Sequence, residues 1–180
     1  MIFTKTNLEG AWIVDIKRLK DERGFFARTF CQNEFRDHGL NPCVAQCNVS
    51  YNKMKGTFRG VHLQVSPYQE AKLVQCISGS IYDVIVDLRP ESPTYLQHLG
   101  LTLTAQNHRM LYIPEGFAHG FLTLEDETNI FYQMSEFYAP ESARGFRWND
   151  PAFGITLPAE VKIISERDAS YPDFSKDLLG

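Results

Sequence analysis

Residues 71–88 read Ala-Lys-Leu-Val-Gln-Cys-Ile-Ser-Gly-Ser-Ile-Tyr-Asp-Val-Ile-Val-Asp-Leu. The second half of this stretch alternates apolar and polar side chains, as a strand does when one of its faces is turned toward a core. The Ser78-Gly79-Ser80 turn joins it to a preceding run that is rich in apolar residues. The stretch therefore predicts two neighbouring strands, over 71–77 and 81–88.

Further strands are predicted on both sides of this pair, over 58–64, 99–104, 109–113, 119–124 and 129–137. Turn residues are frequent and helical periodicity is rare. The helices that we expect are a short one over 32–38, which Gly39 ends, and a second one around 172–179. This pattern predicts an all-β fold, an antiparallel sandwich or jelly roll with short peripheral helices.

The 180 residues carry a formal charge of −4, and 43% of them are hydrophobic. One core can cover most of the apolar surface at this length, so we expect a single domain over 1–180. No apolar run reaches the roughly 18 residues of a membrane span, and no signal-peptide pattern opens the sequence. We therefore expect a cytoplasmic protein without membrane contact. A pI of about 5.7 without a basic block disfavours nucleic acid as a partner.

The cysteines are Cys31, Cys43, Cys47 and Cys76, and no two of them form a C-x-x-C pair. In a reducing compartment we expect free thiols, with Cys76 buried in a strand, rather than zinc ligands or disulfides.

Two histidines stand in recognisable motifs. His62 lies in Gly56-Thr57-Phe58-Arg59-Gly60-Val61-His62-Leu63-Gln64, and His119 follows Pro114-Glu115-Gly116-Phe117-Ala118. The pattern alone is compatible with a hydrogen-bonded sheet histidine in each case. The spacings Gly-x5-His-x-Gln and Pro-x-Gly-x-x-His resemble the two sequence motifs of cupins, which are small double-stranded jelly rolls.

Metal-binding cupins carry a second histidine two residues after the first, and Gln64 occupies that position here. A carboxamide is a weak metal ligand compared with imidazole or carboxylate. Two histidines and Glu70 as a third ligand would remain. We therefore expect no metal and interpret the barrel interior as a polar pocket for acid–base chemistry.

Arg59 and Lys72 flank His62 on its own and the neighbouring predicted strand, and each is also compatible with a surface position. Both cations would be costly to bury unpaired. In a regular strand Arg59 would face away from His62. A bulge at Gly60 would bring the two side chains to one side. Tyr132, taken alone, is compatible with a tyrosine that packs on the sheet.

Segments spread along the chain make a family resemblance specific. They are Asp21-Glu22-Arg23-Gly24-Phe25-Phe26, Gln46-Cys47-Asn48-Val49-Ser50, Arg59-Gly60-Val61-His62-Leu63-Gln64, Lys72-Leu73-Val74, Asp83-Val84-Ile85-Val86-Asp87-Leu88-Arg89, Ile113-Pro114-Glu115-Gly116-Phe117-Ala118-His119-Gly120-Phe121 and Arg147-Trp148-Asn149-Asp150-Pro151. In this order, from about Asp15 to Asp168, they resemble the dTDP-4-dehydrorhamnose 3,5-epimerases.

The resemblance implies an enzyme that inverts C3 and C5 of a nucleotide-linked 4-keto-6-deoxyhexose. A base removes a proton next to the ketone, and an acid returns one to the opposite face of the enolate. His62 matches the family's base, because imidazole accepts protons near neutral pH, and Asp168 matches the carboxylate that orients it. Tyr132 matches the acid, and Lys72 matches a lysine near the developing oxyanion.

The residues that match substrate-binding positions of the family are Arg23, Phe26, Gln46, Asn48, Arg59 and His119. Arginine suits a diphosphate because its planar group donates two hydrogen bonds at once. The resemblance implies no cofactor, since proton transfer leaves the oxidation state unchanged, and the sequence has no Gly-x-Gly-x-x-Gly loop. It also implies a homodimer formed through the sheets.

The chain departs from the family pattern at four positions. Arg28 and Ala143 stand where glutamates are usual, Gln133 where a lysine is usual, and Tyr51 where a small residue is usual. The catalytic set is thus kept while the nucleotide-binding surroundings change. Two consequences follow as hypotheses, namely a nucleotide other than dTDP, or inversion at one carbon only.

Other functions stay open at this point. The nearest is a 3-epimerase or 4-keto-sugar isomerase that acts on a different nucleotide sugar. A metal-dependent cupin and a sugar-binding module without catalysis are the remaining alternatives.

Overall fold

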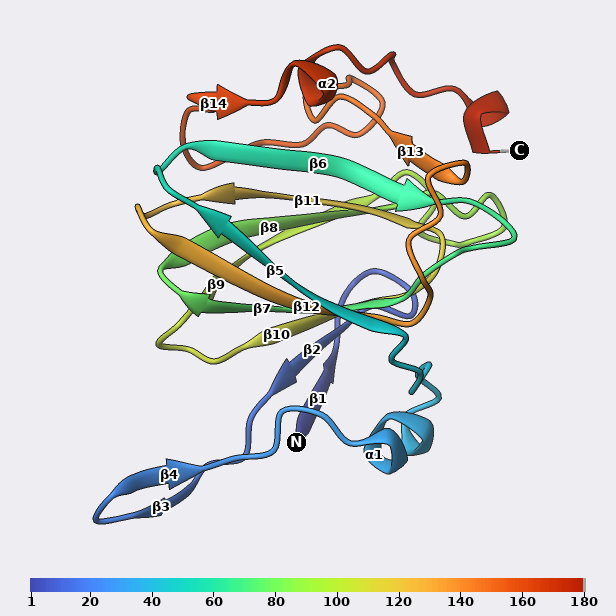
Figure 1. Cartoon of the computed structure of the whole chain (residues 1–180). Coiled ribbons are helices and arrows are strands. Elements are labelled where there is room, and N and C mark those ends of the chain that lie inside the picture. Colours follow the sequence, from blue (N-terminus) through green and yellow to red (C-terminus); the bar gives the residue numbers. More distant parts are fainter. Residues whose placement is uncertain (180) are drawn as a thin grey trace.

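Two β-sheets face each other in the computed structural model, which describes residues 1–179 (Figure 1). The first sheet, in spatial order, contains β1 (Ile2–Lys5), β2 (Trp12–Asp15), β10 (Met110–Ile113), β7 (Lys72–Ser78), β12 (Thr128–Met134) and β5 (Gln46–Asn52). The second contains β13 (Ala143–Gly145), β6 (Thr57–Gln64), β11 (Phe117–Thr123), β8 (Ser80–Asp87) and β9 (His98–Thr104), with β14 (Ile163–Ile164) also paired to β6. The predicted all-β jelly roll is therefore confirmed.

The strands predicted from alternation are all present, each within a few residues of its predicted bounds. The predicted first helix is α1 (Gln32–Asp37). The second helix was placed wrongly, because α2 covers Glu166–Ala169 and only a 3-10 turn, Lys176–Leu179, lies in the predicted region. Ser165 sets the start of α2, since its hydroxyl accepts a hydrogen bond from the Asp168 backbone N–H.

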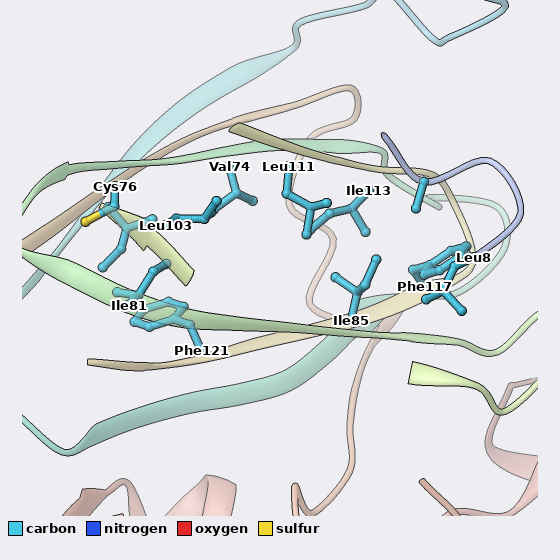
Figure 2. Close-up of a cluster of buried hydrophobic side chains, with 12 residues drawn as sticks. Leu8, Val74, Cys76, Ile81, Ile85, Leu103, Leu111, Ile113, Phe117 and Phe121 are labelled. Atoms are coloured by element: carbon cyan, nitrogen blue, oxygen red, sulfur yellow. The ribbon is translucent and has the colours of Figure 1, made fainter. Parts of the chain in front are cut away.

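An apolar core fills one part of the space between the sheets. Figure 2 shows Val74 and Leu111 of the first sheet pointing toward Ile85 and Phe121 of the second. Val74, Leu111 and Ile85 are fully buried. Burial of such side chains contributes on the order of 2 kcal/mol each, which holds the two sheets face to face.

The outer face of the second sheet is also apolar, and the C-terminal part of the chain covers it (Figure 1). Phe58 and Val61 of β6 pack there with Phe146, Phe153 and Phe174. β14 pairs with β6 in parallel and extends this cover. The C-terminal segment is thereby fixed along β6, next to the position of His62.

A hairpin projects away from both sheets (Figure 1). It consists of β3 (Leu19–Asp21) and β4 (Gly24–Phe26), which pair only with each other. The Asp21 carboxylate accepts hydrogen bonds from the backbone and guanidinium of Arg23, and this fixes the turn. Phe25 and Phe26 are exposed, so the hairpin carries apolar surface that one chain leaves uncovered.

The cysteine predictions are confirmed, because all four residues are free thiols and Cys76 is buried. Burial raises the pKa of the Cys76 thiol to about 11. Among residues 1–179, no helix has the length and apolar character needed to cross a membrane.

An irregularity between β6 and β11 decides how the pocket is lined. His119 pairs with His62, but Phe121 pairs with Arg59, so β6 has one more residue than β11 over this interval. Gly60 lies inside the extra stretch with a φ of +120°. The bulge that Gly60 was expected to allow is therefore present, and Arg59 and His62 reach the same cavity.

We predict that Gly60→Ala strongly destabilises the protein. A Cβ at this position would lie 2.5 Å from the Gly120 Cα and 2.7 Å from the His119 carbonyl oxygen. The positive φ and the overpacking together should lower the free energy of unfolding by about 3 kcal/mol, measured by urea denaturation.

Gly39→Ala is the matched control. Gly39 has a φ of +71° but no atom within 4 Å of an added Cβ, so only the backbone term of about 1 kcal/mol applies. Equal losses for the two variants would contradict the importance of the close approach at Gly60.

Candidate active site

Two cavities inside the barrel share three of the residues singled out from the sequence. A cavity of about 220 Å³ and another of about 400 Å³ are both lined by His62, Lys72 and Tyr132. Arg59 and His119 line only the smaller cavity. The cavities therefore adjoin, and the three shared side chains stand at their junction.

Both sheets contribute to this junction. Lys72 begins β7, and Tyr132 lies on the adjacent β12, where it pairs with Val74. His62 lies on β6 of the opposite sheet, directly across from His119 on β11. An imidazole and a phenol thus approach one space from opposite sheets.

Asp168 orients the ring of His62. Its Oδ1 lies 2.7 Å from the Nε2 of His62, and Oδ2 accepts a hydrogen bond of 3.4 Å from the Gly60 N–H. Burial acts to raise the pKa of the Asp168 carboxyl, but the hydrogen bonds and the neighbouring imidazole outweigh it and hold that pKa below its ordinary value. Because a carboxylate only accepts hydrogen bonds, Nε2 carries the proton in neutral His62 and Nδ1 is left as the basic atom.

His119 has a carboxylate partner of its own. Its Nε2 lies 2.7 Å from Oδ1 of Asp83, which is fully buried on β8. This pairing fixes the ring of His119 in the same way that Asp168 fixes His62.

Lys72 is paired with Glu70. The lysine Nζ lies 2.9 Å from Oε1 of Glu70, and both side chains are largely buried. An ammonium group is thereby held at the junction of the two cavities, with a compensating charge beside it.

Tyr132 is a protonated phenol at neutral pH. Burial raises its pKa above the ordinary value of 10.0, and the positive charge of Arg59 offsets only part of that effect. The Arg59 guanidinium is itself positioned by Asn52, whose side-chain oxygen accepts a hydrogen bond of 2.7 Å from Nε.

The larger cavity holds Gln46 and Asn48 of β5. The side-chain oxygen of Gln46 accepts a hydrogen bond of 3.0 Å from the Tyr138 N–H. The amide nitrogens of Gln46 and Asn48 lie 3.6 Å and 3.3 Å from the sulfur of Met134. Thioether sulfur is a weak acceptor, so both amides keep donor capacity for a bound ligand.

The structure does not bring Arg23 and Phe26 to either cavity within one chain. Both residues lie on the projecting hairpin, and Phe26 is 73% exposed. Within the described residues 1–179, the linings of the two cavities include no residue of this hairpin.

The sequence reasoning did not identify several residues that line the larger cavity or hold a lining side chain in place. They are Gln64, Asp83, Met134, Tyr138, Arg144 and Arg167. Asp83 and Gln64 lie inside quoted motifs, but nothing in the sequence tells which way they face. Arg167 directly precedes Asp168, which is the one sequence feature that pointed toward it.

The four positions at which this chain departs from the family pattern lie in different environments. Ala143 lines the larger cavity. Arg28 pairs with Glu34 at 2.7 Å outside both cavities. Gln133 and Tyr51 alternate with cavity-facing residues and lie on the outer face of the first sheet.

His62, His119 and Glu70, the metal ligands that the sequence left possible, all have charged protein partners. Among the described residues, no three His, Cys, Asp or Glu side chains cluster closely enough to hold a metal ion.

This arrangement is suited to proton transfer next to a carbonyl group. It offers an oriented imidazole, a protonated phenol from the opposite sheet and, in the same cavity, the cationic side chains of Arg59 and Lys72. Such groups meet the needs of a base, an acid and an oxyanion partner.

Comparisons with known proteins agree with the resemblance. A family model described as dTDP-4-dehydrorhamnose 3,5-epimerase matches residues 5–176. The dTDP-4-dehydrorhamnose 3,5-epimerase of Methanothermobacter thermautotrophicus is 44% identical over 172 residues, which cover 94% of this chain and 92% of that protein.

Solved structures extend the similarity to three dimensions. The dTDP-4-dehydrorhamnose 3,5-epimerase from Bacillus anthracis, with TDP and PPi bound, superposes with a TM-score of 0.92 at 39% identity, covering 96% of this chain and 99% of that one. A 3'-monoepimerase from Streptomyces bikiniensis, in complex with dTDP-quinovose, gives a TM-score of 0.85 at 31% identity, covering 93% and 85%. Sequence and fold agree over nearly the whole length, and this chain belongs to the dTDP-4-dehydrorhamnose 3,5-epimerase family.

Proposed function

We propose that this protein epimerises C3 and C5 of a dTDP-linked 4-keto-6-deoxyhexose without a cofactor. The observation that carries the proposal is the shared lining of both cavities by His62, Lys72 and Tyr132. The size of the cavities supports one ligand in two parts, with the sugar in the smaller cavity and the nucleotide in the larger. The relatives' names and the bound TDP of the Bacillus anthracis structure support this substrate class.

His62 is the proposed base. Its Nδ1 takes a proton from the carbon next to the ketone, and the electron pair of the broken C–H bond forms the enolate. The positive charge that develops on the ring is stabilised by Asp168. Because only a proton moves, the reaction needs no redox partner.

Tyr132 is the proposed acid and Lys72 the proposed partner of the enolate oxygen. The raised pKa of the phenol keeps its proton available at neutral pH. Protonation from the tyrosine side, opposite His62, inverts the carbon. A fixed ammonium near the oxyanion is worth roughly 3 kcal/mol by comparison with other oxyanion donors.

The proposed substrate contacts divide between the cavities. Arg59 and His119 contact the sugar end, and Gln46 and Asn48 bind the nucleotide and its diphosphate with their free amide donors.

We also propose a homodimer. The outer face of the first sheet exposes Val49 at 60% and Tyr51 at 50%, and the hairpin exposes Phe25 and Phe26. Exposed apolar side chains such as these are typical of surfaces that a partner subunit covers. A second copy would also give Arg23 and Phe26 a binding cavity to reach, which supports their proposed role in substrate binding.

We also propose that the protein is a single domain and is located in the cytoplasm. Its C-terminal segment supplies Asp168 to His62 and packs on β6, which supports one folding unit over the whole chain. The exposed free thiols of Cys43 and Cys47 support a reducing compartment.

A second candidate is a 3-epimerase, which the similarity to the Streptomyces bikiniensis 3'-monoepimerase favours. Ala143 in the larger cavity separately favours a changed nucleotide preference.

The substrate proposal predicts incorporation of solvent deuterium at both C3 and C5 of dTDP-4-keto-6-deoxyglucose, followed by proton NMR in deuterium oxide. GDP-, CDP- and UDP-linked 4-keto sugars should exchange more slowly. Incorporation at C3 alone would identify a 3-epimerase, and faster exchange with another nucleotide would establish the changed preference.

His62→Asn should reduce this exchange by at least about 10³-fold, because it removes the base. Affinity for dTDP, measured by calorimetry, should change less than about threefold, since Gln46 and Asn48 are the proposed nucleotide contacts. Exchange that persists in the variant would contradict the assignment of His62 as the base.

Asp168→Asn should lower the free energy of unfolding by about 2 kcal/mol at neutral pH, because a charge-assisted hydrogen bond is lost. The folded-state pKa of Asp168 is depressed. Its stabilisation is therefore present above the unfolded pKa of about 3.9 and lost as the pH falls through the lower folded value. Urea denaturation from pH 7 to pH 3 should show the difference between parent and variant shrinking. Glu22→Gln, which changes an exposed carboxylate in the hairpin turn, should cause no measurable change at any pH.

Val49→Asp should weaken the proposed dimer by about 100-fold, because it places a charge on the apolar surface that the proposed contact buries. Sedimentation velocity measures the change. Ile163→Asp is the matched control, since Ile163 is also exposed but lies on β14 beside the other sheet. A parent protein that sediments as a monomer would rule out the dimer.

A further inference from the structure

Glu70 is a buried carboxylate with a single polar partner. Its side chain is 3% exposed, and its Oε1 lies 2.9 Å from Nζ of Lys72. The second oxygen, Oε2, is buried and has no hydrogen-bond partner among the described residues. An unpaired buried oxygen lowers the stability of the folded protein. A stabilising role in the fold therefore does not explain Glu70.

The placement of Glu70 directs it toward the cavity. It lies two residues before Lys72, at the start of β7, and residues two apart in an extended chain share a face. Both side chains line the larger cavity together with His62 and Tyr132.

Lys72 lines two cavities that contain other cations and the Asp168 carboxylate. Its side chain is 10% exposed, Arg59 lines the smaller cavity with it, and Arg144 and Arg167 line the larger one. A buried ammonium in this setting is poorly solvated. A carboxylate in direct contact compensates for that loss of solvation.

We propose that Glu70 is a positioning residue that holds the ammonium group of Lys72 toward the substrate ketone. This inference rests on the proposed epimerase function. One carboxylate oxygen uses one of the three N–H donors of the lysine, which leaves the other two free for the enolate oxygen. Glu70 therefore acts through Lys72 and does not itself contact the reacting atoms.

This role has a distinctive kinetic signature. The enolate oxygen is common to the reactions at both carbons, so loss of Glu70 slows C3 and C5 exchange by the same factor. Displacing a catalytic group by about 1 Å costs up to roughly 100-fold in rate. Substrate binding is unaffected, because the sugar and nucleotide contacts come from other residues.

The test is a double-mutant cycle with Glu70→Gln and Lys72→Met, assayed by deuterium exchange of the nucleotide 4-keto sugar that the parent enzyme accepts. We expect Glu70→Gln to lower kcat by about 10- to 100-fold at both carbons, with KM within twofold of the parent. In the Lys72→Met background the same substitution should change kcat less than twofold. Asp15→Asn, which removes a carboxylate from the Arg109 ion pair outside both cavities, is the control and should leave kcat unchanged.

Equal effects of Glu70→Gln in the two backgrounds would overturn the proposal. So would a rise in KM at constant kcat, which would identify Glu70 as a substrate ligand. A crystal structure of Glu70→Gln gives a readout independent of turnover, in which Nζ of Lys72 should leave its present position. If the parent protein exchanges no substrate proton but Nζ moves as expected, the proposed function fails while the structural role of Glu70 stands.

Discussion

The hydrogen bond between Asp168 and His62 connects the C-terminal segment, which lies outside the second sheet, with the cavities between the two sheets. Asp168 belongs to the C-terminal segment, which packs on the outer face of the second sheet, whereas His62 faces the interior. The carboxylate reaches the ring at the point where Gly60 interrupts the regular strand and donates its own N–H. The bulge therefore does two things, since it turns Arg59 inward and admits the group that orients the proposed base.

The apolar core and the cavities lie along the same strands, whose inward side chains are apolar at some positions and polar at others. On β7, Val74 and Cys76 belong to the apolar core, while Lys72 on the same face lines the cavities. On β11, His119 stands between Phe117 and Phe121 of that core. Basic groups so close to apolar packing require compensation, and Asp168, Asp83 and Glu70 provide it for His62, His119 and Lys72 respectively.

Alternation of apolar and polar residues was enough to predict most of the two sheets. It works where one face of a strand meets the core, as for Leu99, Leu101 and Leu103 of β9, because packing then decides the conformation. β8 is buried on both faces, and its Asp83 and Asp87 share a face with Ile81 and Ile85. Alternation failed for β5, whose inward side chains, Gln46 and Asn48, are polar because they line a cavity. The second helix was misplaced because α2 is short and depends on the Ser165 cap and on the docking of Asp168 rather than on helical periodicity.

The site was predictable to the extent that family motifs mark it. Pattern alone left His62 and His119 as ordinary sheet histidines, and only the resemblance gave them roles. The partners of these groups were harder to find, because Asp83 and Glu70 are recognisable only once burial and direction are known. Arg23 and Phe26 also matched family positions, but in one chain they lie on the projecting hairpin and line neither cavity.

The proposed second subunit also bears on how the proposed reaction is shielded from water. The side chain of His62 is 41% exposed in one chain, whereas an enolate next to a charged base is best protected in a closed site. The larger cavity, which borders His62, is also lined by polar side chains such as those of Tyr138 and Arg167, so a bound nucleotide would lie beside the proposed base. In the proposed dimer, Phe25 and Phe26 on the hairpin of the second copy, which are exposed in one chain, would supply further apolar cover. The proposed dimer would therefore couple dimerisation to catalysis, because one chain alone leaves the ring of His62 partly exposed.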